Sequence, residues 1–256
     1  QRQMCIRDSV YTGASVGGSW QWQPHNQYHV KAGARGLNWA GSQPESMSDY
    51  RAKIDSVKQP YVSHETGQWC AFPIFSEIRK YTGVNKAKNF EIFRDILNDN
   101  HMGSMGHDFM MASGKLQAIC YKHEIEKTLR TPDYAGFQLL ALNDYSGQGT
   151  ALVGLLDVFF EEKGYINADE FRRFCSPTVP LARIPKFVYT SDETFHADIE
   201  VSHFGAAPLQ GAKTVYSIKD EYGKVYAHGT VGTQDIPVGN LCQLGSVDMK
   251  LNGITT

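Results

Sequence analysis

The sequence contains few cysteines, no long apolar run and almost no excess of charge. Its five cysteines are scattered and show no Cys-x-x-Cys spacing, so they predict neither a disulfide framework nor a zinc site. No apolar run approaches the roughly 20 residues that a transmembrane helix needs, so membrane insertion is not expected. The formal net charge of −2 gives no electrostatic reason to expect nucleic acid or an anionic membrane as a partner.

The sequence begins at Gln1, with neither an initiator methionine nor a signal-peptide pattern at its start. It ends close to a strand-like run, and we therefore expect it to be a fragment of a longer protein. Residues 1–9 look like translated adapter sequence, and we set them aside as non-native. The remaining composition is ordinary: 41% of the 256 residues are hydrophobic and 20% are charged, which is typical of a folded protein.

The first part of the chain alternates between strand-like and helix-like stretches. Apolar runs predict strands at residues 10–15, 27–31, 60–64 and 136–142. Apolar residues at helical spacing predict helices at residues 72–81, 89–97, 107–129, 152–163 and 167–174. This alternation indicates an α/β fold, in which residues 10–180 supply about half of a (β/α)₈ TIM barrel.

Beyond residue 180 the pattern changes to strands only. Prolines at positions 177, 180 and 185 indicate a domain boundary. Alternating apolar and polar residues, with glycines in the turns, predict strands at residues 186–189, 194–203, 213–219, 224–230 and 244–251. We therefore expect residues 181–256 to form an all-β immunoglobulin-like sandwich, incomplete because such a domain has ~100 residues.

The strongest functional pattern lies between Pro60 and Pro73, PYVSHETGQWCAFP. A short strand delivers His64 and Glu65 to its C-terminal end, and Trp69 follows after a glycine. In a barrel enzyme, a carboxylate at such a position can attack or stabilise an anomeric carbon, and an indole can stack on a pyranose ring. The plainer alternative is a surface acid beside a core tryptophan.

Two other catalytic motifs are incomplete. Residues 13–17 match the G-x-S-x-G nucleophile elbow, but glycines and Pro24 follow where the elbow requires a helix. His64 and Glu65 begin like H-E-x-x-H, but Gln68 replaces the second histidine and Gly67 interrupts the helix. Neither a serine hydrolase nor a zinc protease is expected.

Asn143 and Asp144 follow the apolar run at residues 136–142. From the residues alone, Asp144 could be a second catalytic carboxylate, a ligand of substrate hydroxyls, or a turn former beside Ser146 and Gly147. These alternatives stay open.

Three parts of the sequence together resemble glycoside hydrolase family 2, in its bacterial β-galactosidase-like branch. They are YVSHETGQWCAFP, the block from Ala112 to Asp157 and the strand-rich end, so the resemblance covers roughly residues 10–250. It implies a multidomain enzyme with a TIM barrel and following β-sandwich. Such an enzyme cleaves β-linked sugars with retention, using two glutamates and no metal or organic cofactor, and a periplasmic or extracellular location would fit.

Carried onto this chain, the resemblance makes Glu65 the catalytic nucleophile. The side chains that it implies at the substrate are His64, Trp69, Asn143 and Asp144 and, by a weaker match, Tyr28 and His29. A hydroxyl or imidazole donor from Tyr28 or His64 is expected to keep Glu65 ionised.

The acid/base glutamate of that family follows an asparagine, and no Asn-Glu pair occurs in this chain. We expect it in a missing N-terminal half, so the fragment alone is expected to be inactive. The expected partner is an oligo- or polysaccharide substrate. The alternative is a non-catalytic carbohydrate-binding or scaffold protein on the same fold.

Overall fold

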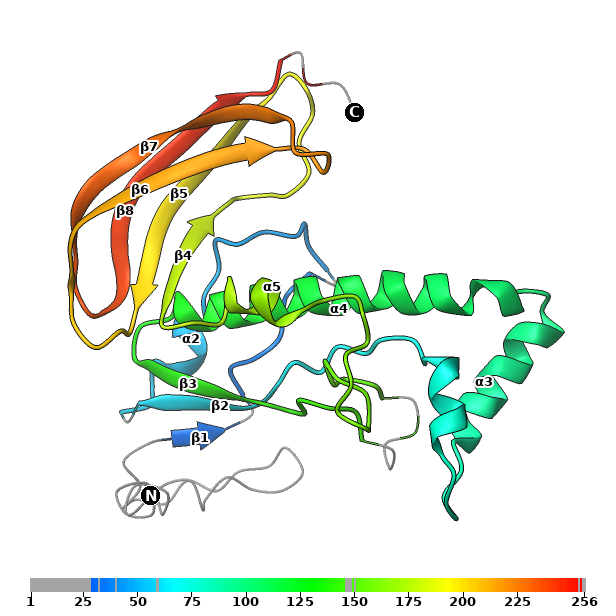
Figure 1. Cartoon of the computed structure of the whole chain (residues 1–256). Helices are drawn as coiled ribbons and strands as arrows, with labels where there is room; N and C mark the ends of the chain where they lie inside the picture. Colours follow the sequence, from blue (N-terminus) through cyan, green and yellow to red (C-terminus); the bar gives the residue numbers. More distant parts are fainter. Residues whose placement is uncertain are drawn as a thin grey trace. The chain divides into compact units, whose positions relative to one another are not determined.

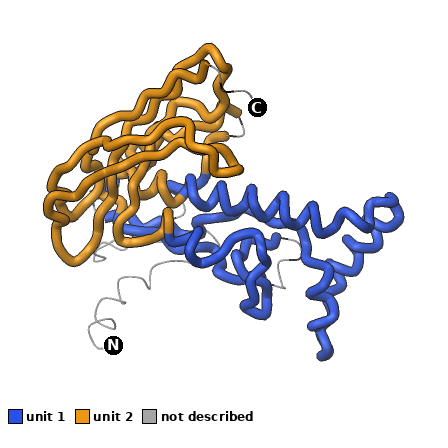
Figure 2. The backbone as a smooth tube through the Cα atoms, turned by 45° about the horizontal axis from the view of Figure 1, so that its top comes forward, with its two compact units in different colours: residues 1–36, 57–124, 135–172 blue, residues 37–56, 125–134, 173–256 orange. Residues whose placement is uncertain are grey.

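The computed structural model describes residues 29–31, 33–39, 41–58, 60–145, 149, 151–252 and 254. The chain divides into two compact units, each built from three separate stretches of sequence (Figure 2). Unit 1 comprises Gln1–Gly36, Val57–Glu124 and Ala135–Arg172, and unit 2 comprises Leu37–Ser56, Ile125–Tyr134 and Arg173–Thr256.

The α/β part contains a small open sheet in the order β1-β2-β3 (Figure 1). Its strands are β1 (His29–Lys31), β2 (Tyr61–Thr66) and β3 (Tyr134–Leu139). Strands β1 and β2 are parallel, with His29 opposite Tyr61, which confirms the predicted parallel pairing of these two segments. The first three residues of β2 are all buried, as expected for a strand with cover on both faces. The predicted strand at residues 10–15 lies outside the described residues.

The helices of the α/β part agree with the sequence pattern where that pattern is long. Helix α3 (Lys88–Asp99) buries Phe90 and Leu97 on one face, and α4 (Gly106–Leu129) is the long helix that the apolar spacing predicts. The shorter helical elements are two 3₁₀ helices, Phe75–Lys80 and Gly103–Met105, and α5 (Ala168–Arg172). The predictions for residues 89–97 and 107–129 are therefore confirmed.

The helix predicted at residues 152–163 is wrong. This segment has isolated bridges from Leu156 to Asn143 and to Glu162, which require extended backbone. Asp157 then accepts the backbone N–H groups of Phe159 and Glu161 at 2.8 and 2.9 Å and so closes a tight turn. An aspartate that binds nearby backbone competes with helical hydrogen bonds, which explains the failure.

Unit 2 contains a short helix, α2 (Arg51–Ile54), and two antiparallel sheets. Strands β4 (Thr178–Arg183), β5 (Thr194–His203) and β8 (Gly239–Lys250) form one sheet in the order β4-β5-β8. Strands β6 (Leu209–Lys219) and β7 (Val225–Ile236) form a two-stranded ribbon. No described residue between 186 and 250 is helical, so the strand-only prediction for this stretch is confirmed.

The fold class predicted from the sequence is nevertheless wrong. The described sheets are small and open: three strands where a half barrel was expected, and three plus two strands where an immunoglobulin-like sandwich was expected. The apolar run at residues 136–142 was taken for a strand buried on both faces, yet β3 is half-exposed from Phe137 to Leu139. Residues 186–189 are not a strand, whereas β4 was missed because Pro180 lies in it. A proline is tolerated there because β4 is an edge strand.

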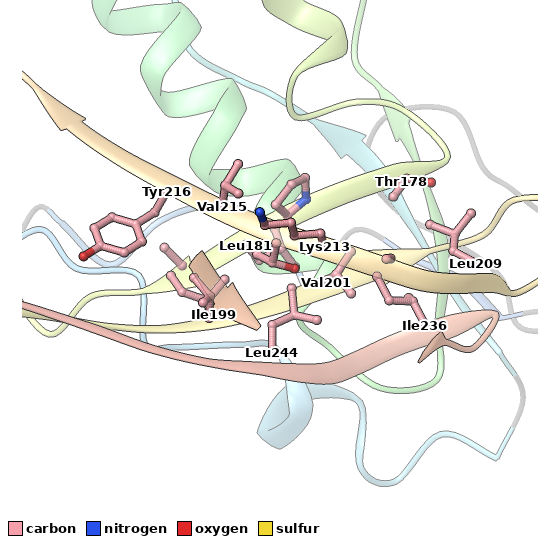
Figure 3. Close-up of a pocket in the computed structure, with 15 residues that line it drawn as sticks. Thr178, Leu181, Ile199, Val201, Leu209, Lys213, Val215, Tyr216, Ile236 and Leu244 are labelled. Carbon is pink, nitrogen blue, oxygen red and sulfur yellow. The ribbon is translucent and has the colours of Figure 1, made fainter. Parts of the chain in front are cut away.

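The sheets of unit 2 border an apolar cavity of about 460 Å³ (Figure 3). Its lining includes Leu181, Ile199, Val201, Ile236 and Leu244. Three of these, Val201, Ile236 and Leu244, also form a buried cluster. The ribbon of β6 and β7 therefore contributes side chains to this core but leaves a cavity in it, whereas the core of a complete sandwich would be close-packed.

In the described part of the chain, no helix is both long and apolar enough to cross a membrane.

Candidate functional site around Glu65

Glu65 is the penultimate residue of strand β2 and has an unusual backbone conformation. Its φ angle is 59°, in the left-handed region that side chains other than glycine rarely occupy. Such a residue costs roughly 1–2 kcal/mol, so the surrounding structure must hold it there. Gly67, two residues later, has a φ of 85° and completes the turn. The Glu65 side chain remains 16% exposed, which leaves it accessible to a ligand.

Arg35 holds this strained turn through one guanidinium nitrogen. Arg35 Nη1 donates to Glu65 Oε2 at 3.0 Å, to the Glu65 carbonyl at 2.8 Å and to the His64 carbonyl at 3.1 Å. One cation therefore stabilises both the carboxylate charge and the backbone that presents it. The sequence did not single out Arg35, because it lies in a glycine-containing loop 30 residues from Glu65.

His64 lies beside Glu65 but makes no hydrogen bond to its carboxylate. Its Nε2 lies 4.0 Å from Glu65 Oε1, too far for a hydrogen bond. Its other ring nitrogen, Nδ1, lies 2.9 Å from Oε1 of Gln138 on β3. This contact ties the imidazole of His64 to β3. Of the two expected partners of Glu65, Tyr28 lies outside the described residues.

Trp69 is half-buried, and its indole is fixed by a carboxylate. Trp69 Nε1 donates to Glu124 Oε2 at 2.7 Å, and the backbone N–H of Gly36 donates to Glu124 Oε1 at 2.7 Å. Glu124 lies on α4 and is only 2% exposed. Burial raises the pKa of Glu124, and hydrogen bonds from Gly36, Trp69 and Gly67 oppose that rise. No local pattern pointed to Glu124, which lies 55 residues from Trp69 in the chain.

The loop that carries Arg35 is anchored at its start by Tyr61. The backbone N–H groups of Gly33 and Ala34 both donate to the Tyr61 hydroxyl, each at 3.1 Å. Tyr61 is buried on β2, and burial raises its pKa. Residues 33–36 are thus tied to β2 and α4 on either side of Arg35.

Asn143 and Asp144 have mainly internal partners. The Asp144 carboxylate is buried and binds Lys163 Nζ at 2.7 Å and the backbone N–H of Gly154 at 2.9 Å. Burial raises the pKa of Asp144 and lowers that of Lys163, while their mutual attraction opposes both shifts. Asn143 donates to the Asp144 carbonyl at 2.9 Å. Their contact with substrate stays a prediction, as does that of His29, of which the structure describes the backbone in β1 alone.

A second group of buried charges surrounds Glu77 on the 3₁₀ helix Phe75–Lys80. Glu77 is 1% exposed, and burial, together with the negative charge of Asp157, raises its pKa to about 7. The Tyr81 hydroxyl donates to Glu77 at 3.2 Å, while Lys80 binds Asp157 at 2.6 Å. No motif in the sequence had pointed to this group. Across the residues that the structure describes, no three His, Cys, Asp or Glu side chains gather so that they could hold a metal ion.

Comparison with known protein families matches residues 193–256 to a domain of unknown function (DUF8488). This segment holds β5 to β8 and does not include Glu65 or its partners. A search of curated proteins finds no match. The geometry around Glu65 is therefore the main ground for a functional proposal.

Proposed function

We propose that this chain carries the nucleophile of a retaining β-glycosidase of the β-galactosidase-like type, and that Glu65 is that nucleophile. The observation that supports it best is the presentation of Glu65 at a strained strand end. Arg35 binds one carboxylate oxygen, Oε2, while Oε1 lies 4.0 Å from the nearest imidazole nitrogen. A part-exposed carboxylate with one oxygen anchored and the other directed elsewhere suits attack on an anomeric carbon.

In the proposed reaction, Glu65 attacks the anomeric carbon while the bond from that carbon to the leaving oxygen breaks. The leaving oxygen takes a proton from a general acid, and an ester joins the sugar to Glu65. Water then attacks the same carbon and gives a proton back to that acid, now acting as a base; the ester breaks, and the sugar leaves with its configuration retained. Arg35 fixes the direction of the nucleophile through its three hydrogen bonds, which is a positioning effect. The general acid is not assigned to a described residue.

Trp69 is the residue that we propose as a platform for the sugar ring. Its indole is half-buried and cannot turn freely, because the indole N–H is bound to Glu124. The backbone carbonyl of Trp69 is also held, by Gln117 Nε2 at 2.6 Å. A fixed aromatic face can take the apolar face of a pyranose without losing much conformational entropy. His64 and Asn143, both half-buried, are further candidates for contacts to sugar hydroxyls.

The test uses probes that need no general acid. Fluoride leaves without protonation, so 2-deoxy-2-fluoro-β-glycosyl fluorides of galacto, gluco and manno configuration would esterify Glu65 directly. We expect mass spectrometry of peptides to find one sugar on Glu65, and none on a Glu65→Gln variant. The stability of that variant should stay within about 1 kcal/mol, because the lost ion pair is partly exposed.

The result also separates catalysis from binding. Titration of each probe, followed by tryptophan fluorescence, reports whether the sugar binds at all. Binding without labelling would support the alternative, a non-catalytic carbohydrate-binding protein. Labelling of a carboxylate other than Glu65 would show that the nucleophile is misplaced.

A further inference from the structure

Glu124 contacts both of the segments that present Glu65. One is the loop after β1, whose Gly36 N–H donates to Glu124 Oε1 at 2.7 Å. The other is the turn after β2, where the Trp69 indole donates to Oε2 at 2.7 Å and the Gly67 N–H also donates. These two segments carry Arg35 and Trp69, the two side chains that the proposed site requires beside Glu65.

The chemistry of the three donors requires a carboxylate at this point. All three are N–H groups, and only an ionised carboxylate offers acceptors on both oxygens without a competing donor. Glu124 is 2% exposed, so solvent cannot replace a contact that is lost. A glutamine would have the same shape but would turn an NH₂ group toward at least one of these donors.

The loop residue Arg35 is held from both sides. Tyr61 accepts the N–H groups of Gly33 and Ala34 before it, and Glu124 accepts that of Gly36 after it. Arg35 itself reaches back to Glu65 and to the backbone of the strand end. A displacement of Gly36 would therefore move the guanidinium away from the carboxylate that it orients.

From these contacts we infer that Glu124 is a positioning residue for the proposed glycosyl transfer: it holds Arg35 and Trp69 in register with Glu65. The inference rests on the proposed function. It assigns Glu124 no contact with substrate and no proton transfer. Its loss should therefore slow bond formation, through Arg35, and weaken sugar binding by a smaller factor, through Trp69.

The experiment compares Glu124→Gln with wild type in labelling by the 2-deoxy-2-fluoro-glycosyl fluoride that reacts. We expect the maximal labelling rate to fall by about 10- to 100-fold, as expected for a displacement on the order of 1 Å at the reacting atoms. The dissociation constant of the probe should rise by a smaller factor, less than about tenfold, because Trp69 loses its anchor but is not removed. Glu77→Gln is the matched control, because Glu77 is also a buried carboxylate of unit 1 but binds neither segment.

A second measurement reports the contact itself. The indole N–H proton resonance of Trp69, identified by its loss in Trp69→Phe, should shift in Glu124→Gln and stay in place in Glu77→Gln. If Glu124→Gln does not fold, Glu124→Asp keeps the charge with a shorter reach and should also slow labelling.

The outcomes separate the two levels of the proposal. If wild type is labelled and the maximal labelling rate of Glu124→Gln is within about twofold of the wild-type rate, the positioning role alone is overturned. An unmoved indole resonance would overturn it as well. A wild type that no probe labels would overturn the proposed function, and the role of Glu124 with it.

Discussion

Glu65 combines a strained backbone with a charged side chain, and Arg35 compensates for both. The left-handed φ of 59° would be easier for glycine, yet a glycine here would remove the carboxylate. Arg35 donates to two carbonyls and one carboxylate oxygen at this turn. Strained backbone conformations of this kind are common at functional sites, where the surrounding structure holds a side chain in the position that function requires.

Arg35→Ala should therefore harm function more than stability. Glu65 would lose its only described cationic contact closer than 4 Å, and labelling by the fluoride probe should fall by about 10²-fold through misplacement. The free energy of unfolding should drop by only about 1–2 kcal/mol, because the residue is partly exposed. Kinetics of labelling and urea unfolding measure the two effects. Arg79→Ala, at an exposed site, should change neither. Equal labelling rates in the two variants would contradict the role of Arg35.

Local sequence patterns predicted part of this site, but the residues that act through contacts distant in sequence could not be predicted. Glu65 and Trp69 were recognisable because a strand, a glycine and an indole follow one another within a few residues. Arg35 and Glu124 were not, because their roles depend on partners 30 and 55 residues away in the chain. Asp144 was recognisable as an acid after an apolar run, but its buried partner Lys163 could not be read from the sequence.

At the scale of elements, the turn after β2 depends on Gly67. Its φ is 85°, and a Cβ at this position would lie 1.9 Å from the ring of Tyr121. That ring cannot move aside, because Tyr121 is fully buried and donates to the carbonyls of Gly67 and Val153 at 2.9 and 2.7 Å. The turn that carries Trp69 is therefore packed directly against α4.

Gly67→Ala should lower the free energy of unfolding by more than about 2 kcal/mol, through the positive φ and the overlap with Tyr121. Gly83→Ala is the matched control, since nothing lies within 4 Å of a Cβ built there and its φ is not in the left-handed range. That control should stay within about 0.5 kcal/mol of wild type. Thermal or urea unfolding measures the free energy of unfolding of both variants. A Gly67→Ala protein as stable as Gly83→Ala would refute the packing argument.

The 3₁₀ helix Phe75–Lys80 places Glu77 where its ionisation opposes folding. The pKa of Glu77 is about 7 in the folded protein and has an ordinary value of 4.5. The folded state therefore holds a proton that the unfolded state releases between these two pH values. Stability from this group is complete below about pH 4.5 and is lost as the pH rises through 7.

Glu77→Gln should remove this loss, because the amide cannot ionise. At pH 5 the variant and wild type should have similar free energies of unfolding. At pH 8 the variant should be the more stable of the two, by up to about 3 kcal/mol. Urea unfolding at both pH values measures the difference. If the two proteins changed in parallel with pH, the charge on Glu77 would not be the cause.

Helices and strands were predictable where one helical or strand-like repeat of apolar residues continued over enough of the chain. Helix α3 follows apolar spacing, and β5 to β8 follow alternation with glycine turns. The failures have local causes: Asp157 closes a turn inside a helix-like stretch, and Pro180 occupies an edge strand. The fold class failed for another reason, because the size and closure of a sheet depend on strand pairings that periodicity does not encode.

At the scale of the whole molecule, the strand-rich unit uses segments far from its strands. Ser46 donates to the Ala182 carbonyl at 2.8 Å and accepts the N–H of Ile184 at 2.9 Å. Asn240, at the start of β8, donates to the carbonyls of Leu129 and Thr131 at 3.1 and 2.8 Å. Unit 2 is therefore defined by contacts among three stretches rather than by a continuous segment.

A chain of residues 181–256 alone should then fold poorly. It would begin inside β4, whose six residues pair with β5, and would remove the buried Val179 from this sheet. It would also lack Arg130, whose Nε lies 3.9 Å from Oε1 of the fully buried Glu200, and would leave Arg183, at 3.0 Å, as the arginine that pairs with this carboxylate. Loss of a partner from a buried charge is costly, and an exposed strand edge promotes association. We expect dye binding and a broad unfolding transition by circular dichroism, in contrast to a cooperative transition of the same strands in the 256-residue chain. A monomeric 181–256 chain that unfolds sharply would show that β5 to β8 suffice, and that the segments before residue 181 merely attach to them.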